Sequence, residues 1–243
     1  MVLVTGSATG IGEGIARRLA HEGAIPVIHG REEERETGER IAAELGGAFV
    51  AGELSDSETP ERIVQAVIAQ AGRLDGLVNC AGVSWRGGIE ATAEFFDRVL
   101  AINARAPFLT TQAALPHLQA SRGSVVSIGS SLARHPAPNL VPYSMSKAAL
   151  AAMTRALSRD FAKDGIRINA LNLGWTLTPN ERALNVETNG WAEDWPDTIG
   201  QKQPFGRLLL PEDVGPMVAY LLSDEARMIT GQVWDFDQQS FGG

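Results

Sequence analysis

Tyr143 and Lys147 are the residues whose types and spacing point most directly to chemistry. They stand four positions apart in a segment with a helical period, so their side chains share one face of a helix. A phenol with a pKa near ~10 exchanges protons poorly at pH 7 until a cation stabilises its phenolate, as an ammonium one turn away can. Ser130 lies on a predicted loop thirteen residues before Tyr143. The pattern indicates a proton-transfer site; the alternative is a surface pair worth a few tenths of a kcal/mol.

A glycine-rich loop opens the chain, at residues 5–12, with glycines at positions 6, 10 and 12. It follows the apolar run 2–4 and leads directly into a helical period at Ile11, Ile15 and Leu19. Glycines there permit a sharp turn and let a pyrophosphate approach the N–H groups at the positive end of the helix. The loop therefore predicts a dinucleotide site, or, alternatively, a glycine turn that only tightens the joint between strand and helix.

The sequence His29-Gly30-Arg31 ends the second predicted strand. An NAD site would have Asp or Glu there to bind the ribose 2′-hydroxyl. Arg31 instead offers a planar fork of donors for a 2′-phosphate, and Gly30 leaves room for it. This favours NADP(H) over NAD(H). The alternative is that Arg31 pairs with the acidic run 32–34, which suits the positive end of the next helix.

Short apolar runs alternate with longer segments of helical period along the whole chain. Strands are expected at 2–4, 25–28, 48–51, 76–78, 124–128, 167–171 and 232–236, and helices from residue 11 and at 32–45, 60–71, 91–118, 142–163 and 211–222. Strands that are apolar on both faces need helices on both sides. The pattern predicts an α/β fold, one Rossmann-like domain over 1–243 with a doubly wound parallel sheet.

One segment, 175–206, interrupts this alternation, with only a weak helical period around 180–186. Long irregular segments in compact domains tend to be lids or binding loops, so a substrate lid is expected here; the alternative is an insertion pinned by its tryptophans. An aromatic and amide-rich pocket could stack on and hydrogen-bond a sugar or polyol. Its candidate residues are Trp85, Trp175, Trp191, Trp195, Asn180, Asn185 and Asn189.

Composition excludes several classes of protein. The 243 residues carry a formal net charge of −8, which makes nucleic acid and anionic membranes poor partners. No apolar run is long enough to span a bilayer. The four histidines match no zinc motif, so no metal is expected. The histidines are interpreted as structural, with His29 a lesser candidate for a place near a ligand. The single cysteine, Cys80, is expected in the core, and the lack of disulfides favours a reducing compartment, the cytoplasm.

Together these motifs resemble the short-chain dehydrogenase/reductase family over most of the chain. The glycine loop, the sequence 79–82 (Asn-Cys-Ala-Gly), Asn103, Ser130, Tyr143-x-x-x-Lys147 and Gly174 follow the family's order and spacing. The resemblance implies that Tyr143 is the acid/base and Ser130 binds the same substrate oxygen. It also implies that Lys147 lowers the tyrosine pKa and binds the nicotinamide ribose, and that Asn103 holds a water in the proton relay.

The resemblance and the loop chemistry together give a set of expected binding residues. Those expected at the cofactor are Gly6, Ser7, Thr9, Gly10, Ile11, Gly12, Arg31, Glu53, Leu54, Asn79, Ala81, Gly82, Tyr143, Lys147, Gly174, Thr176 and Thr178. Those expected at the substrate are Ser130, Trp85, Trp175 and Trp191.

The chain departs from the family pattern at four places. Cys80 stands where Asn is usual, Glu53 where Asp is frequent, and Leu173 where Pro is usual, and the segment 235–240 lacks the family's Asp-Gly-Gly. The family further implies a homodimer or homotetramer, with the helix of Tyr143 and its predecessor in one interface. The apolar run 148–153 suits close helix packing there, or equally a buried helix.

The expected function is that of an NADP(H)-dependent oxidoreductase that moves hydride between the nicotinamide and a carbonyl or secondary alcohol of a small molecule. Two alternatives stay open. One is a 3-oxoacyl thioester reductase of the acyl-carrier-protein type, for which Arg134, Arg155 and Arg159 are too dispersed in sequence to predict a basic docking patch. The other is a non-catalytic dinucleotide-binding regulator on the same fold.

Overall fold

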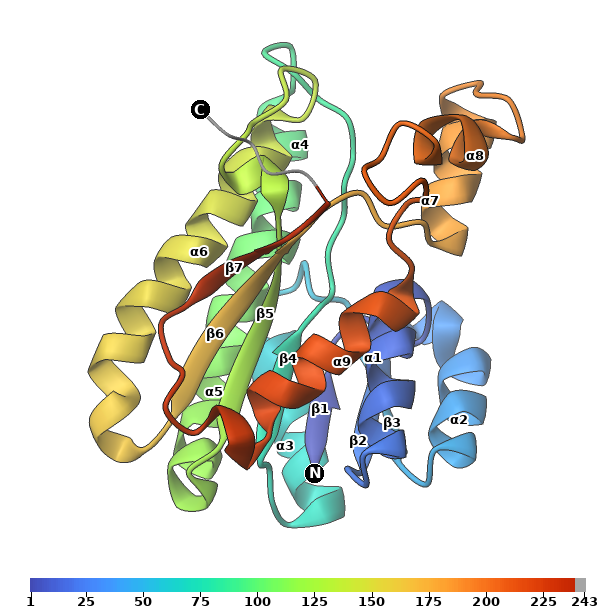
Figure 1. Cartoon of the computed structure of the whole chain (residues 1–243). Coiled ribbons are helices and arrows are strands. Elements are labelled where there is room, and N and C mark those ends of the chain that lie inside the picture. The colour runs from blue at the N-terminus through green and yellow to red at the C-terminus, as the bar shows by residue number, and fades with distance from the viewer. Residues whose placement is uncertain (239–243) are drawn as a thin grey trace.

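A seven-stranded parallel sheet runs through the centre of the computed structural model, which describes residues 1–238 (Figure 1). The strand order is β3-β2-β1-β4-β5-β6-β7, and every neighbouring pair is parallel. The strands are β1 (Val2–Val4), β2 (Pro26–Gly30), β3 (Ala48–Ala51), β4 (Gly76–Asn79), β5 (Ser124–Ser130), β6 (Arg167–Leu173) and β7 (Val233–Phe236). The predicted doubly wound α/β fold is confirmed.

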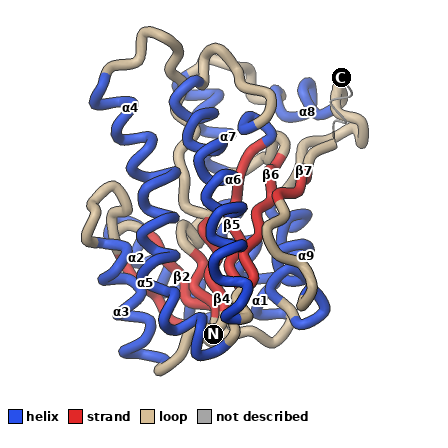
Figure 2. The backbone as a smooth tube through the Cα atoms, turned by 90° about the vertical axis from the view of Figure 1, so that its left-hand side faces the viewer, coloured by secondary structure: helices blue, strands red, loops and turns tan. Residues whose placement is uncertain are grey.

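Helices cover both faces of this sheet, as the view along it shows (Figure 2). Helices α1 (Gly10–His21), α2 (Arg35–Glu44) and α9 (Pro211–Leu222) pack on one face. Helices α3 (Thr59–Ala71), α5 (Ala106–Ser121) and α6 (Val141–Phe161) pack on the other. The remaining helices are α4 (Ala93–Leu100), α7 (Pro179–Ala183) and α8 (Trp195–Gly200). None of the helices in residues 1–238 is long and apolar enough to cross a membrane.

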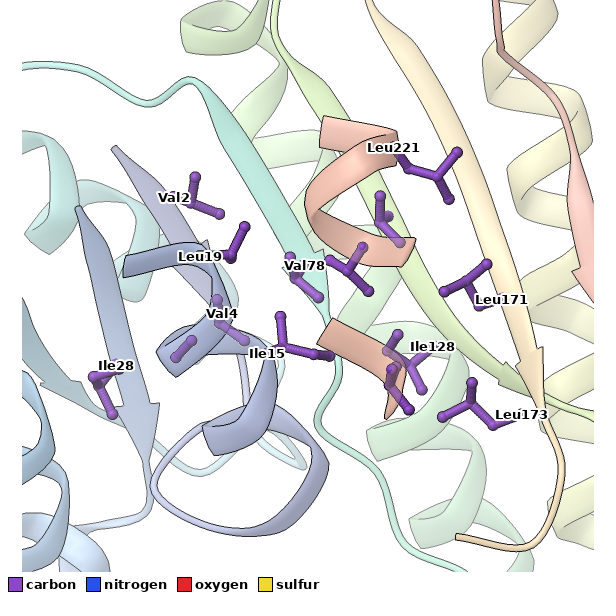
Figure 3. Packing of buried hydrophobic residues seen from close by; sticks show 14 of the residues in the cluster. Val2, Val4, Ile15, Leu19, Ile28, Val78, Ile128, Leu171, Leu173 and Leu221 are labelled. Carbon is purple, nitrogen blue, oxygen red and sulfur yellow. The ribbon is translucent and has the colours of Figure 1, made fainter. Parts of the chain in front are cut away.

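The core is divided by the sheet into two apolar layers, and alternation along β1 shows why. Val2 and Val4 lie in the layer with α1 and α9 (Figure 3). Leu3 lies in the other layer, with residues of α3 and α5. Each strand residue thus buries its side chain whichever way it points, which contributes about 1.5–3 kcal/mol for each large aliphatic side chain. This two-sided burial is the physical reason for the continuous apolar runs in the sequence.

The helical region expected over 91–118 is interrupted by a π-helical turn, Ala101–Arg105, between α4 and α5. There the Ala106 N–H donates to the Ala101 carbonyl, five residues back. Pro107, in the first turn of α5, has no N–H to continue the α-helical bonding, so the wider turn is accommodated immediately before it. The turn contains Asn103, which is fully buried.

The segment 175–206 is more regular than the sequence predicted. It contains α7, a π-helical turn (Leu184–Thr188) and α8. The start of α7 is capped, because Thr178 Oγ1 accepts from the Glu181 N–H at 3.0 Å and Pro179 follows the cap. These short helices lie above the carboxyl ends of the strands (Figure 1).

Candidate active site

A cleft of about 900 Å³ opens at the carboxyl ends of the strands, where the winding of the sheet reverses between β1 and β4. Most of the residues expected at the cofactor or the substrate line it. They are Gly6, Thr9, Gly10, Ile11, Gly12, Arg31, Glu53, Leu54, Ala81, Gly82, Trp85, Ser130, Tyr143, Lys147, Gly174, Trp175, Thr176, Thr178 and Trp191. Ser7, Asn79 and Asn103 are not part of the lining and lie behind it, each less than 9% exposed.

The glycine loop folds tightly against the end of β4. Gly6 has a φ of +64°, and a Cβ there would lie 2.7 Å from the Ala81 Cα. A Cβ on Gly12 would lie 2.2 Å from the Gly6 carbonyl oxygen. Only glycine fits both positions, so the loop stays narrow and keeps the first turn of α1 open to the cleft.

The imidazole of His29 bridges this loop to the ends of β2 and β3. His29 is buried; its Nδ1 accepts from the Gly6 N–H at 3.0 Å, and its Nε2 lies 3.2 Å from the Gly52 carbonyl oxygen. These bonds assign the proton to Nε2. Burial lowers the pKa of His29 from 6.5 to about 4, so the ring is neutral at pH 7. His29 thus shapes the cleft as a structural residue.

Protonation of His29 should destabilise the fold as pH falls. Its folded pKa lies below the unfolded value, so its contribution is complete above pH 6.5 and is lost towards pH 4, which amounts to about 3 kcal/mol. Urea unfolding at pH 7 and pH 4.5 should show a smaller pH-dependent loss in His29→Gln than in the parent. His21→Gln, at an exposed position, serves as the control. An identical pH dependence in parent and His29→Gln would contradict this.

Ser7, Asn79 and Asn103 bind the structure that forms the wall of the cleft. Ser7 Oγ donates to the Val4 carbonyl and accepts from the His29 N–H. Asn79 Nδ2 donates to Thr111 Oγ1. Asn103 uses both ends of its amide on Val83, accepting from the N–H at 2.9 Å and donating to the carbonyl at 2.8 Å.

The side chain of Asn103 also reaches the helix of Tyr143, and its role in holding a water stays a prediction. Its Nδ2 also donates to Ser146 Oγ on α6 at 3.1 Å, and the side chain is fully buried. Both amide atoms are therefore occupied by protein. The side chain ties the loop after β4 to the helix that carries Tyr143.

Tyr143, Ser130 and Lys147 converge where β5 and α6 face the cleft. Ser130 ends β5 and accepts from the Leu132 N–H at 3.2 Å, while Tyr143 and Lys147 lie one turn apart on α6. Lys147 Nζ donates to the Ile128 carbonyl at 2.9 Å and lies 5.7 Å from the centroid of the Tyr143 ring. The site thus combines a phenol, a hydroxyl and a buried amine.

The pKa of Tyr143 is raised above its ordinary value, chiefly because burial disfavours the phenolate. A hydrogen bond with Ser130 acts in the opposite direction, and the negative charge of Glu181 adds to the rise. The lowering of this pKa by Lys147, which the family resemblance implies, stays a prediction. In the structure the Lys147 amine is bonded to the Ile128 carbonyl.

Burial also lowers the pKa of Lys147 from 10.5 to about 8. At pH 7 the group is still an ammonium in a nearly dry environment. Cys80, at the start of the same wall, has a thiol whose pKa burial raises to about 12. The thiol is therefore protonated at pH 7. The sequence predicts Cys80 in the core, whereas the residue is only partly buried: it packs against the core and lines the cleft.

Arg31 is paired with the acidic residues that follow it. Its guanidinium lies 2.9 Å from Glu33 and 3.2 Å from Glu34, and its N–H donates to Glu34 Oε2 at 2.8 Å. A Cβ on Gly30 would lie 3.1 Å from the same Glu34 oxygen. The corner of the cleft beside β2 therefore holds one cation and two carboxylates in contact.

Three tryptophans of the segment 175–206 pack on one another. Trp175 stacks on Trp195 with ring centroids 5.5 Å apart, and Trp191 meets both edge-on. Trp175 and Trp191 line the cleft, whereas Trp195 is buried behind them. The cluster therefore both holds the segment together and supplies aromatic wall.

Among the charged residues that line the cleft, Glu181, Arg86 and Arg98 were not indicated by the sequence. Glu181 Oε1 accepts from Trp175 Nε1 and from Asn185 Nδ2, both at 2.9 Å. Arg86 follows Trp85 in the loop after β4, and Arg98 lies on α4. The only available signal was their proximity in sequence to Trp85 and Thr178, which did not reveal where their side chains point.

Comparison with known proteins places the chain among oxidoreductases. A family model described as "Enoyl-(Acyl carrier protein) reductase" matches residues 6–238. A curated relative, the 4-formylbenzenesulfonate dehydrogenase of Comamonas testosteroni, is 36% identical over 98% of this chain and 96% of its own length.

Two solved structures share the fold closely. An actinorhodin polyketide ketoreductase with NADPH superposes with a TM-score of 0.90 at 31% identity, over 98% of this chain and 95% of that one. A 3-ketoacyl-(acyl-carrier-protein) reductase from Brucella melitensis, complexed with NADH, has a TM-score of 0.85 at 32% identity, over 96% and 95%. The first of these structures contains NADPH and the second NADH.

Proposed function

The chain belongs to the short-chain dehydrogenase/reductase family, and on that premise we propose that this oxidoreductase transfers hydride between NADP(H) and a carbonyl or secondary alcohol of a small molecule. The observation that carries the proposal is the convergence of Tyr143, Ser130 and Lys147 on a cleft that begins at a glycine loop. Among residues 1–238, Tyr143 is the one tyrosine that lines the cleft.

The lining suits a dinucleotide. The narrow loop at Gly6 and Gly12 leaves the positive end of α1 facing the cleft, where a pyrophosphate would bind. Gly82 leaves space beside Lys147 Nζ, since a Cβ there would lie 3.4 Å from that atom. Lys147 would hold the ribose next to the nicotinamide, and Thr176 and Thr178 would border the ring. The nicotinamide supplies or accepts the hydride.

The protein's own part in the reaction is to hold the substrate oxygen and exchange a proton with it. Tyr143 would donate its hydroxyl proton as the carbonyl is reduced, and Ser130 would donate a hydrogen bond to the same oxygen as its charge develops. The raised pKa of Tyr143 keeps the phenol protonated at pH 7, which suits the direction of reduction. Asn103 contributes by fixing the loop at Val83 against α6.

Absorbance at 340 nm, a property of the reduced cofactor, tests the proposal directly. Purified protein, NADPH and a panel of aldehydes, ketones, ketoses and a 3-oxoacyl thioester should show oxidation of NADPH that depends on the substrate. Tight binding of NADPH without turnover of any panel member would support a dinucleotide-binding regulator instead. A panel that responds only to the thioester would select the acyl thioester reductase.

For the cofactor we propose NADP(H), with Arg31 as the ligand of the 2′-phosphate. Arg31→Ala should raise the KM for NADPH by at least about tenfold, because one charged hydrogen bond is worth about 1.5–3 kcal/mol. The KM for NADH should change little. Glu34→Gln should lower the KM for NADPH, since its carboxylate now holds the guanidinium. Equal effects of Arg31→Ala on both cofactors would contradict the NADP(H) assignment.

For the substrate we propose a small hydroxylated carbonyl compound, of which a sugar or polyol is one case. The support is the aromatic and amide lining from Trp175, Trp191, Asn180 and Asn185, which the segment 175–206 brings over the reacting groups as a lid. The thioester alternative draws its support from Arg86 and Arg98, which supply positive charge in the cleft itself.

We also propose a homodimer or homotetramer in the cytoplasm. Helix α6 exposes Met145, Ala148, Ala149 and Ala152, and α5 exposes Phe108, so the two helices present an apolar surface that a second copy could cover. Light scattering on the purified protein tests the assembly.

A further inference from the structure

Resting on the proposed function, the geometry points to a further recognition element: Arg86, assisted by Arg98, binds an anionic group on the substrate. The substrate class is then a small carbonyl compound or alcohol that carries a carboxylate, sulfonate or phosphate. The observations behind this are the contacts, the missing counter-charges and the position of the two guanidinium groups.

The guanidinium of Arg86 is held in place by uncharged groups. Its Cζ lies 5.4 Å from the centroid of the Trp191 ring, and one Nη donates to Asn185 Oδ1 at 3.4 Å. Asn185 is only 1% exposed and is itself anchored to Glu181. The Trp191 ring and the Asn185 amide fix the direction of the Arg86 side chain. They use few of the five N–H donors of the guanidinium, so most of these donors remain available to a ligand.

Arg98 stands in a similar environment. Its Cζ lies 5.0 Å from the centroid of the Trp85 ring, and Trp85 packs against Phe95 with centroids 6.2 Å apart. Both indoles line the cleft, as do both arginines. Two guanidinium groups, each on an aromatic face, thus belong to the same cavity.

Neither arginine has a carboxylate within 4.0 Å among residues 1–238. Eight of the eighteen arginines have no carboxylate within 4.0 Å among residues 1–238, and of these eight only Arg86 and Arg98 line the cleft. The arginines with a carboxylate partner are Arg17, Arg18, Arg31, Arg35, Arg40, Arg62, Arg73, Arg134, Arg182 and Arg207. A guanidinium without a carboxylate partner in the cleft can pair with a negative charge that the ligand supplies.

Charge also orders the two ends of the substrate. Glu181 acts electrostatically on Tyr143, so an anion is disfavoured beside the reacting oxygen. Arg86 instead contacts the far side of Asn185, whose Nδ2 donates to Glu181. The carbonyl is therefore directed to Ser130 and Tyr143 and the anion to Arg86. Trp175, Trp191 and Leu184 also line the cleft.

Arg86 also joins two separate parts of the chain. It comes from the loop after β4, while Trp191 and Asn185 belong to the segment 175–206, which rises with α4 above the carboxyl ends of the strands (Figure 1). An anion bound to Arg86 would thus be held between the loop and the lid.

Matched substrates that differ only in charge test the inference. The three positional isomers of formylbenzoate are compared with their methyl esters, using kcat/KM at low ionic strength. At least one isomer should exceed its ester by about tenfold or more, the size of one charge-assisted hydrogen bond. In Arg86→Gln this ratio should fall below about threefold, mainly through KM. Arg155→Gln, an exposed arginine of α6 outside the cleft, should keep the parent ratio.

Binding gives a second readout that does not depend on turnover. Benzoate should quench or shift tryptophan fluorescence of the dinucleotide complex at lower concentration than methyl benzoate, and Arg86→Gln should remove the difference. The assignment is overturned if Arg86→Gln keeps the parent ratio of kcat/KM for anion over ester, or if only Arg98→Gln lowers this ratio. It is also overturned if the parent shows no preference for the anion. Turnover of the esters without such a preference would leave the proposed oxidoreductase intact, whereas failure to reduce any carbonyl would reject that function itself.

Discussion

Tyr143→Phe should reduce kcat by about 10²–10⁴-fold, the range that a positioned acid–base group contributes. The phenylalanine keeps the ring and its packing but has no proton to exchange with the substrate oxygen. Because the hydroxyl of Tyr143 is expected at the substrate oxygen and not at the pyrophosphate or adenosine of the cofactor, the Kd for NADPH should change by less than about twofold. Single-turnover oxidation of NADPH at 340 nm and fluorescence titration of the cofactor measure the two quantities.

Tyr220→Phe is the matched control, because Tyr220 is the second of the chain's two tyrosines and lies on α9, 37% exposed. It should leave both kcat and cofactor affinity unchanged. Normal turnover in Tyr143→Phe would end the assignment of the acid/base. Loss of NADPH binding in the same variant would show that the hydroxyl serves the cofactor and not the proton transfer.

Lys147→Met should separate catalysis from stability. We expect kcat/KM to fall by at least about 10²-fold, since the ammonium that holds the ribose and stabilises the phenolate is lost. The free energy of unfolding should be unchanged or higher at pH 7, because methionine fills a similar volume without a buried charge. A variant that loses activity while keeping or gaining stability is the signature of a group retained for function.

The sign of the stability effect follows from the lowered pKa. The folded state disfavours the ammonium, with a pKa of about 8 against 10.5, so the parent loses about 3 kcal/mol below pH 8 and recovers it as pH rises to 10.5. Denaturant unfolding from pH 7 to pH 10 should therefore show rising stability in the parent and a flatter profile in the variant. Lys163→Met, at an exposed site beside Asp160, should follow the parent; a clearly destabilised Lys147→Met would contradict the expectation.

The two variants probe different parts of one site. Tyr143 is expected to act on the substrate oxygen, and Lys147 on the ribose and on the charge of the phenol. Without ligands in the cleft, the pKa of Tyr143 is governed by burial, Ser130 and Glu181. If Lys147 acts on the phenol once cofactor and substrate are bound, Lys147→Met should change the pH dependence of kcat.

The sequence alone determined the order and type of the helices and strands. It also indicated most of the residues that line the cleft at the carboxyl ends of the strands. Two-sided apolar runs such as Val2–Val4, glycine spacing, and the four-residue interval between Tyr143 and Lys147 are local features, and local periodicity is set by backbone geometry. The bounds expected at 48–51 and 211–222 agree with those of β3 and α9. Regularity in 175–206 was underestimated, because its short helices depend on a cap at Thr178 and on tryptophan packing.

Only the tertiary structure decided which partner each polar side chain has. His29 bonds to Gly6, 23 residues away, and Arg86 to Asn185, 99 residues away, and no period in the sequence encodes such pairs. The same holds for Asn103, whose amide is occupied by Val83, and for Glu181, which acts on Tyr143. Secondary structure follows from neighbours along the chain, whereas the charge and hydrogen bonding of a cleft follow from segments that meet only after the sheet has assembled.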